Sequence, residues 1–156
     1  MIEYQIDYLG NKKDFFDSLV SLWLMEWGSS TKKAYIEAKK KKYRERLSTT
    51  NPPFVLVAFE GNELIGSAGL SNHDLEKRPD LSPWLVGVLV RPEFRNHGVA
   101  SSLIAEVIDK ARRLGYERLY LHTEKAQGLY EKLGWHFLEH TINDMGEESD
   151  VYYLDI

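Results

Sequence analysis

The segment of residues 95–100 combines the residue types that bind phosphate groups, and it reads Arg95-Asn96-His97-Gly98-Val99-Ala100. Gly98 allows the backbone to approach a ligand closely, and a helix beginning near Val99 offers unpaired N–H groups and a partial positive charge. Arg95 adds a guanidinium suited to phosphate oxygens. The segment therefore predicts a pyrophosphate-binding turn, although an ordinary strand-to-helix connection with a capping glycine would give the same spacing.

The elements that must position this turn are recognisable on both sides of it. The apolar run at residues 84–90 predicts a buried central strand, which Pro92 ends. From residue 99 to 114 the apolar residues fall on one helical face, and Gly115 is placed as a C-terminal cap. Residues 118–123 predict the next strand. The turn then lies inside a strand-helix-strand unit, whose two strands should be parallel with a right-handed crossover.

The remaining segments predict further strands and helices around this unit. The N-terminal half should contain a strand at 2–8, helices at 14–27 and 31–47, and a hairpin with strands 54–59 and 64–70. The C-terminal half should contain a short helix at 126–133 and strands at 135–138 and 151–156, which flank an acidic loop at 139–150. The whole chain, residues 1–156, is predicted to be a single domain.

Two motifs resemble those of the GNAT acetyltransferase superfamily. The first is Val88-Leu-Val-Arg-Pro-Glu-Phe-Arg-Asn-His-Gly-Val-Ala-Ser-Ser-Leu-Ile104, which is similar to the pattern valine-x-proline followed by Arg/Gln-x-x-Gly-x-Gly/Ala at a helix start. The second is Ala126-Gln-Gly-Leu-Tyr-Glu-Lys-Leu-Gly-Trp135, which resembles the family's later leucine-tyrosine-x-x-x-glycine-aromatic segment. The resemblance implies a mixed α/β fold, with a mostly antiparallel sheet that contains one parallel pair and is flanked by about four helices.

The resemblance also implies a co-substrate, acetyl-CoA. Backbone groups of Val88, Leu89 and Val90 would contact its acetyl and pantetheine portions. The residues that would hold its pyrophosphate are Arg95, Asn96, His97, Gly98, Val99, Ala100 and Ser101. Asn96 stands where glycine is frequent in the family, and asparagine tolerates left-handed backbone conformations better than most residues. The link Glu124-Lys125 is shorter than in many relatives, which puts a further cofactor contact from an asparagine in doubt.

Two side chains are candidates for moving protons during acetyl transfer to an amine. An alkyl amine with a pKa near ~10 is protonated at neutral pH, so a nearby base should help. His122, with an ordinary pKa near ~6.5, lies where some family members carry a carboxylate base; a water relay would serve as well. Tyr130 matches the family tyrosine that protonates the departing thiolate. A backbone N–H near Leu89 or Val90 would stabilise the negative charge on the acetyl oxygen.

Composition excludes several other kinds of protein. The chain contains no cysteine, which rules out disulfides, thiolate metal sites and a cysteine nucleophile, and direct transfer without an acyl-enzyme is therefore favoured. The chemistry requires no metal. No apolar run approaches the length of a membrane span and the first residues do not form a secretory signal, so we expect a cytoplasmic protein without a membrane partner. The net charge of −4 argues against a nucleic-acid partner.

The function predicted from the sequence is acetyl-CoA-dependent N-acetylation of a primary amine on a small molecule or a protein. The alternative is a non-catalytic acyl-CoA-binding sensor or assembly module. A nucleic-acid adaptor would use the basic run Lys39-Lys-Lys-Lys42 with Arg44 and Arg46, which we interpret as the solvated face of a helix. The acceptor stays open among a protein N-terminus, a lysine, a polyamine, an aminoglycoside and an amino-acid-like metabolite, and a homodimer is also left open.

Overall fold

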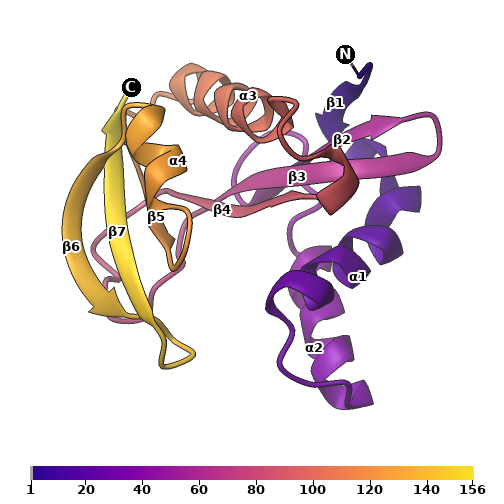
Figure 1. Cartoon of the computed structure of the whole chain (residues 1–156), viewed down its shortest axis with the longest axis horizontal. Coiled ribbons are helices and arrows are strands. Elements are labelled where there is room, and N and C mark those ends of the chain that lie inside the picture. The colour runs from indigo at the N-terminus through magenta and orange to yellow at the C-terminus, as the bar shows by residue number, and fades with distance from the viewer. Residues whose placement is uncertain (1) are drawn as a thin grey trace.

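The computed structural model describes residues 2–156, which form one seven-stranded sheet and four α-helices in those residues (Figure 1). The strand order is β1-β2-β3-β4-β5-β7-β6. The β4–β5 pair is parallel and the other pairs are antiparallel, as predicted. The strands are β1 (Gln5–Tyr8), β2 (Phe54–Glu60), β3 (Glu63–Ser71), β4 (Trp84–Val90), β5 (Arg118–Thr123), β6 (His136–Ile142) and β7 (Glu148–Asp155). The helices are α1 (Phe16–Trp27), α2 (Lys33–Arg44), α3 (Val99–Arg113) and α4 (Gln127–Lys132), and short 3₁₀ turns are η1 (Leu9–Asn11), η2 (Lys13–Phe15) and η3 (Pro92–Phe94).

Both faces of the sheet are covered by helices, and β2 illustrates this directly. Phe54 and Leu56 belong to the core cluster that contains the inner side of α3, whereas Val55 and Val57 belong to the cluster that contains Leu19 of α1. Successive strand residues point to opposite faces, so a strand buried on both sides reads as a continuous apolar run. Figure 1 shows α3 and α1 on opposite sides of the strands.

Two expected segments differ in the structure. The predicted helix at 31–47 is shorter, because α2 ends at Arg44. The predicted acidic loop at 139–150 is mostly strand, with β6 continuing to Ile142 and β7 beginning at Glu148. All residues of β6 are exposed or half-buried, so the strand shows no alternation of buried and exposed side chains. Backbone pairing with β7 stabilises it.

The β4 strand contains a bulge that sequence periodicity did not reveal. Ser67 pairs with Leu89 and Gly69 with Val86, so β4 carries one more residue than β3 across this stretch. Gly87 lies at the bulge with a φ of 59°, and the Ser67 hydroxyl donates a hydrogen bond to the Gly87 carbonyl at 2.9 Å. Glycine adopts this left-handed conformation with the least strain because it has no Cβ.

Beyond the bulge, β4 and β5 separate. Their ladder contains the single pair Trp84↔Tyr120, at the start of β4. Figure 1 shows the two strands diverging from that point, with α3 and α4 beside the opening. The β5-facing backbone groups of residues 88–90 are therefore free of ladder pairing.

Candidate functional site

The predicted phosphate turn has the backbone geometry that anion binding requires. Asn96 and Gly98 have φ angles of 66° and 78°, and α3 begins directly afterwards at Val99. No side chain caps the N-terminus of α3. A Cβ placed on Gly98 would meet no heavy atom within 4 Å, so the space beside this backbone is open. The first N–H groups of α3 are thus accessible to an anion.

Two side chains of this turn make contacts that shape it. The Nδ1 atom of His97 lies 2.8 Å from the Arg95 carbonyl, which holds the turn closed. The Arg95 Nε–H donates to the Val90 carbonyl at 3.1 Å, and its guanidinium forms an ion pair of 3.4 Å with Glu26 of α1. Arg95 therefore links the turn to the end of β4 and to α1. Ala100 and Ser101, the last two residues predicted in this set, lie in the first turn of α3 and are half-buried.

A cavity of about 690 Å³ lies on the other side of the β4–β5 opening. Its walls come from the end of α1, from α2 and the residues after it, from the loop before β4, from the β4 bulge, from the end of β5 with the following link, and from the β6–β7 turn. Gly87, Val88, His122 and Tyr130 all line it. The structure thus brings both predicted proton-moving side chains to one cavity with the bulged strand.

His122 lies at the centre of a charged cluster in this cavity. Its Nε2 atom is 3.0 Å from a carboxylate oxygen of Asp74, and its Nδ1 atom is 3.0 Å from Glu124. The Ser149 hydroxyl donates to the same Glu124 oxygen at 2.6 Å. These residues come from the β3–β4 loop, β5, the link after β5, and β7, and sequence analysis identified His122 alone among them. Glu124 follows the candidate base His122 by two residues at the end of a predicted strand, and this proximity could have identified it from the sequence. Asp74 and Ser149 lie too far from His122 in the sequence for a local pattern to connect them.

The surroundings of His122 differ from those of the near-neutral base that the sequence predicts. Burial alone would lower the pKa of His122, but hydrogen bonds to Asp74 and Glu124 and their negative charges raise it to about 10. Burial acts to raise the pKa of Glu124, yet its hydrogen bonds with His122 and Ser149 lower it overall. At neutral pH the imidazole is therefore a cation between two carboxylates, and an imidazolium cannot accept a proton. With Asp74 and Glu124 both ionised, this group carries one net negative charge.

Tyr130 lies on α4, and 6% of its surface is exposed. Its ring packs edge-on against Trp135, with 6.0 Å between ring centroids. Burial, and then the negative charge of Glu124, raise the pKa of Tyr130 well above its ordinary value. The phenol therefore keeps its proton throughout the neutral range and remains a hydrogen-bond donor.

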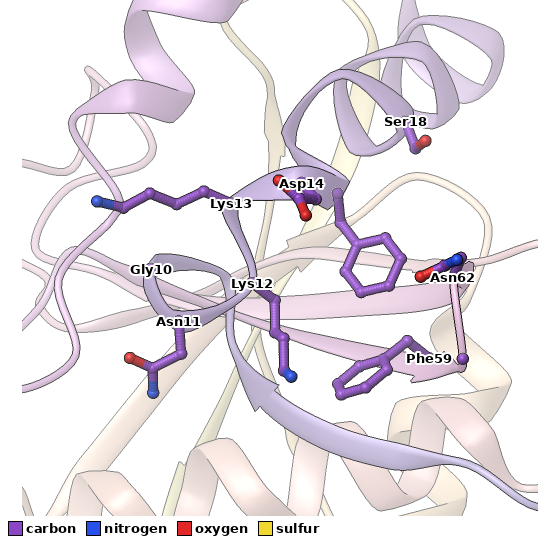
Figure 2. A pocket seen from close by; sticks show the side chains of 10 residues that line it. Gly10, Asn11, Lys12, Lys13, Asp14, Ser18, Phe59 and Asn62 are labelled. Carbon is purple, nitrogen blue, oxygen red and sulfur yellow. The ribbon is translucent and has the colours of Figure 1, made fainter.

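A second hollow, shown in Figure 2, lies apart from this cavity. It is lined by residues 10–15 at the end of β1 together with Ser18 and the β2–β3 turn, and Lys12 lies over the Phe59 ring at 5.1 Å. None of its lining residues lines the cavity beside β4 and β5. Within residues 2–156 no ion pair involves its charged residues Lys12, Lys13 and Asp14, so we assign the candidate site to the cavity beside β4 and β5.

Two further searches of residues 2–156 gave negative results. No group of three or more histidine and acidic side chains in that part of the chain has the arrangement of a metal site. Across the same residues, no helix combines the length and the apolar character needed to cross a bilayer.

The charged cluster gives His122 a measurable effect on stability. Its folded-state pKa of about 10 lies above its ordinary value of 6.5, so its contribution is complete below pH 6.5 and is lost as the pH rises toward 10. The melting temperature of the wild type should therefore fall as the pH rises from 7 to 10, between the ordinary and the folded-state pKa of this histidine. The decline should be shallower in His122→Gln. His140→Gln is the control, because this histidine pairs with Asp150 on the surface, where ion pairs contribute little. Equal slopes in wild type and His122→Gln would contradict the prediction.

Comparison with known proteins gives matches over most of the chain. Residues 14–135 match the acetyltransferase (GNAT) family. The chain is 29% identical over 103 residues to the uncharacterized N-acetyltransferase YsnE of Bacillus subtilis (strain 168), a match that covers 62% of this chain and 64% of YsnE. The fold is similar to that of aminoglycoside 6′-N-acetyltransferase complexed with coenzyme A, with a TM-score of 0.75, 15% identity, and coverage of 99% of this chain and 97% of the other. The fold is also similar to that of yncA from Salmonella typhimurium with its cofactor acetyl-CoA. The TM-score is 0.74, the identity is 15%, and the match covers 99% of this chain and 94% of the other.

Proposed function

Because the chain belongs to the acetyltransferase (GNAT) family, we propose that it transfers an acetyl group from acetyl-CoA directly to the primary amine of an acceptor. One observation carries the proposal: a single cavity contains the β4 bulge, the Tyr130 phenol and the acidic cluster around His122. In this proposal the β4 bulge contacts the acetyl donor, the Tyr130 phenol donates a proton, and the acidic cluster binds the ammonium group of the acceptor. Acetyl-CoA supplies the activated acetyl thioester.

The turn and β4 fit a nucleotide thioester. The accessible N–H groups at the start of α3, beside the left-handed Asn96 and Gly98, suit a pyrophosphate. The edge of residues 88–90 has no ladder pairs with β5 and suits the amide groups of a pantetheine arm, because amides pair with strand backbone. In this proposal the set Val88, Leu89, Val90, Arg95, Asn96, His97, Gly98, Val99, Ala100 and Ser101 binds acetyl-CoA.

We assign Glu124 the role of accepting the proton of the amine. Its carboxylate lines the cavity, and its lowered pKa keeps it ionised at neutral pH. His122, as an imidazolium hydrogen-bonded to Glu124 and Asp74, holds both carboxylates in place. The net negative charge of the cluster attracts a protonated amine. His122 acts here as a positioning residue in place of the free base expected from the sequence.

Tyr130 donates a proton to the departing thiolate, and removing its hydroxyl should slow the reaction. We expect Tyr130→Phe to lower kcat by roughly 10- to 100-fold, near the low end for acid catalysis, because a thiol with a pKa near ~8.5 is a moderate leaving group. The dissociation constant for acetyl-CoA should change little. The control is Tyr152→Phe, which removes a hydroxyl that donates to Glu131 of α4 outside the cavity. An unchanged kcat in Tyr130→Phe would remove Tyr130 from this role.

A thiol-release assay tests the proposed function. Purified protein is mixed with acetyl-CoA and a panel of amines, and binding of acetyl-CoA is measured separately by calorimetry. We expect binding together with amine-dependent release of CoA thiol. Binding with no release for any amine would instead indicate the acyl-CoA sensor, and absence of binding would exclude both functions.

A further inference from the structure

Arg46 is a nearly buried residue, and no acidic group in the described part of the chain neutralises its charge. Arg46 lies two residues beyond the end of α2, is 9% exposed, and lines the cavity beside β4 and β5. No carboxylate within residues 2–156 forms an ion pair with it, and its side chain makes no hydrogen bond there. Its guanidinium carbon lies over the Tyr43 ring, 5.5 Å from the ring centroid. An arginine stays charged, so its withdrawal from water is costly unless an anion meets it.

The Tyr43 hydroxyl is a second donor in the same wall without an acceptor. It is buried, lines the cavity, and has no hydrogen-bond partner in the described chain. Burial raises the pKa of Tyr43 to about 12, although the charge of Arg46 acts in the opposite direction. The phenol is thus protonated and able to donate. A Cβ placed on Gly87 would lie 3.7 Å from this hydroxyl, which puts it beside the β4 bulge.

Acidic groups line another part of this cavity. Asp74 and Glu124 belong to the cluster around His122, and Lys42 lines the same cavity. Partial desolvation lowers the pKa of Lys42, the positive charge of Arg46 lowers it further, and Asp74 raises it. One cavity therefore offers a site for an anion and a site for a cation.

We propose that the acceptor is a small amino acid-like molecule, whose carboxylate binds Arg46 and the Tyr43 hydroxyl while its amine lies at Glu124. This inference rests on the proposed function and names the substrate class of the same site. A guanidinium and a phenol can bind the two oxygens of a carboxylate together. A cavity of about 690 Å³ is of the size that holds a small molecule. Asp144 and Glu147 also line it, which disfavours a dianion such as a phosphate monoester.

Matched acceptors with and without the carboxylate test this inference. The panel consists of the common L-amino acids and their decarboxylated amines, for example phenylalanine with phenethylamine and lysine with cadaverine, together with O-phosphoethanolamine as a phosphate monoester. For at least one pair we expect kcat/KM to be about 10- to 100-fold higher for the amino acid, the range that a charge-assisted hydrogen bond supplies. O-Phosphoethanolamine should show no comparable advantage over ethanolamine.

Variants of Arg46 assign the preference to its guanidinium. For the amino acid and amine pair with the largest difference, Arg46→Gln should reduce the ratio of the two kcat/KM values to about threefold or less, through a higher KM for the amino acid. Arg46→Lys should retain part of this preference. The matched control is Arg44→Gln, which removes the same charge from an exposed residue that pairs with Glu37 at 4.0 Å and does not line the cavity. This control should keep the wild-type ratio. Melting temperatures identify any variant that fails to fold, and Arg46→Lys then carries the test.

The outcomes separate this inference from the proposed function. If thiol release occurs but no amino acid is preferred, or if the preference survives in Arg46→Gln, the inference is overturned and the acetyltransferase proposal stands. A preference for O-phosphoethanolamine alone would also overturn the carboxylate assignment. If acetyl-CoA binds and no acceptor causes release, the proposed function fails. Calorimetric titration of the amino acids into the CoA complex then tests the proposed carboxylate site by itself. Amino-acid binding that is weaker in Arg46→Gln than in wild type supports the inference. Binding that is equal in the two proteins, or absent from wild type, overturns it.

Discussion

Replacing Glu124 by glutamine should lower kcat/KM for acetyl transfer by about 10²- to 10⁴-fold, the range typically lost with a general acid or base. Glutamine has the same shape and can still accept the hydrogen bond from His122, which spans 3.0 Å. It cannot take a proton, and it removes the charge that makes the cluster net negative. The variant therefore separates the chemistry of Glu124 from its packing. Glu147→Gln is the control, because it removes one negative charge from the cavity lining outside the cluster.

The pH dependence of kcat identifies the proton acceptor. Because the pKa of Glu124 lies below its ordinary value of 4.5, the acidic limb due to Glu124 should lie below pH 4.5. If His122 were the base, as its sequence position suggests, the limb would lie near its pKa of about 10. Profiles measured with two acceptors of different amine pKa show whether a limb reflects a group of the enzyme, which stays at the same pH, or the amine of the acceptor, which shifts with its pKa. A limb near pH 10 that is independent of the acceptor and absent in His122→Gln would contradict the role of Glu124.

Gly98→Val should reduce the affinity for acetyl-CoA at least about 100-fold, which corresponds to roughly 2.7 kcal/mol. The φ of Gly98 is 78°, a conformation that a β-branched residue avoids. A Cβ at this position meets nothing within 4 Å, so the effect arises from backbone strain and not from a clash with the protein. The strain is relieved by turning the N–H groups at the start of α3 away from the phosphates. Calorimetry with acetyl-CoA measures the loss.

The other end of the same helix supplies the control for this substitution. Gly115, just after α3, has a φ of 91° and equally open space around its Cβ position. Gly115→Val should therefore cost similar stability while leaving the affinity for acetyl-CoA near that of the wild type. Gly98→Asn should bind better than Gly98→Val, because asparagine tolerates left-handed φ. Equal affinity in Gly98→Val and wild type would refute the phosphate turn.

Much of the donor side of the site could be predicted because its signals are local. The apolar run of β4, the helical face of α3 and the left-handed glycine between them lie within about thirty neighbouring positions, where hydrophobic periodicity is informative. The bulge in β4 was missed because one extra residue leaves the apolar run unchanged. The glycine inside that run, Gly87, was its only trace in the sequence.

The acceptor side could not be predicted to the same extent, because its contacts join distant segments. The partners of His122 include Asp74 and Ser149, and no periodicity indicates such pairs. Arg46 was interpreted as part of a solvated helix face together with Arg44. Since α2 ends at Arg44, the chain changes direction and Arg46 points inward. The strands in residues 139–150 were missed because polar side chains on both faces of β6 obscure the pattern of a strand.

Because β4 and β5 share a single ladder pair, the residues proposed for the donor and those proposed for the acceptor lie on different parts of the opening and are distributed differently along the chain. The residues proposed to bind the donor lie in one short stretch, 88–101, on one side of the opening. The residues proposed to determine acceptor specificity come from five separate stretches of chain. If the proposals hold, substitutions around Arg46 or Asp144 should change the preferred acceptor while the contacts proposed for the donor stay unchanged.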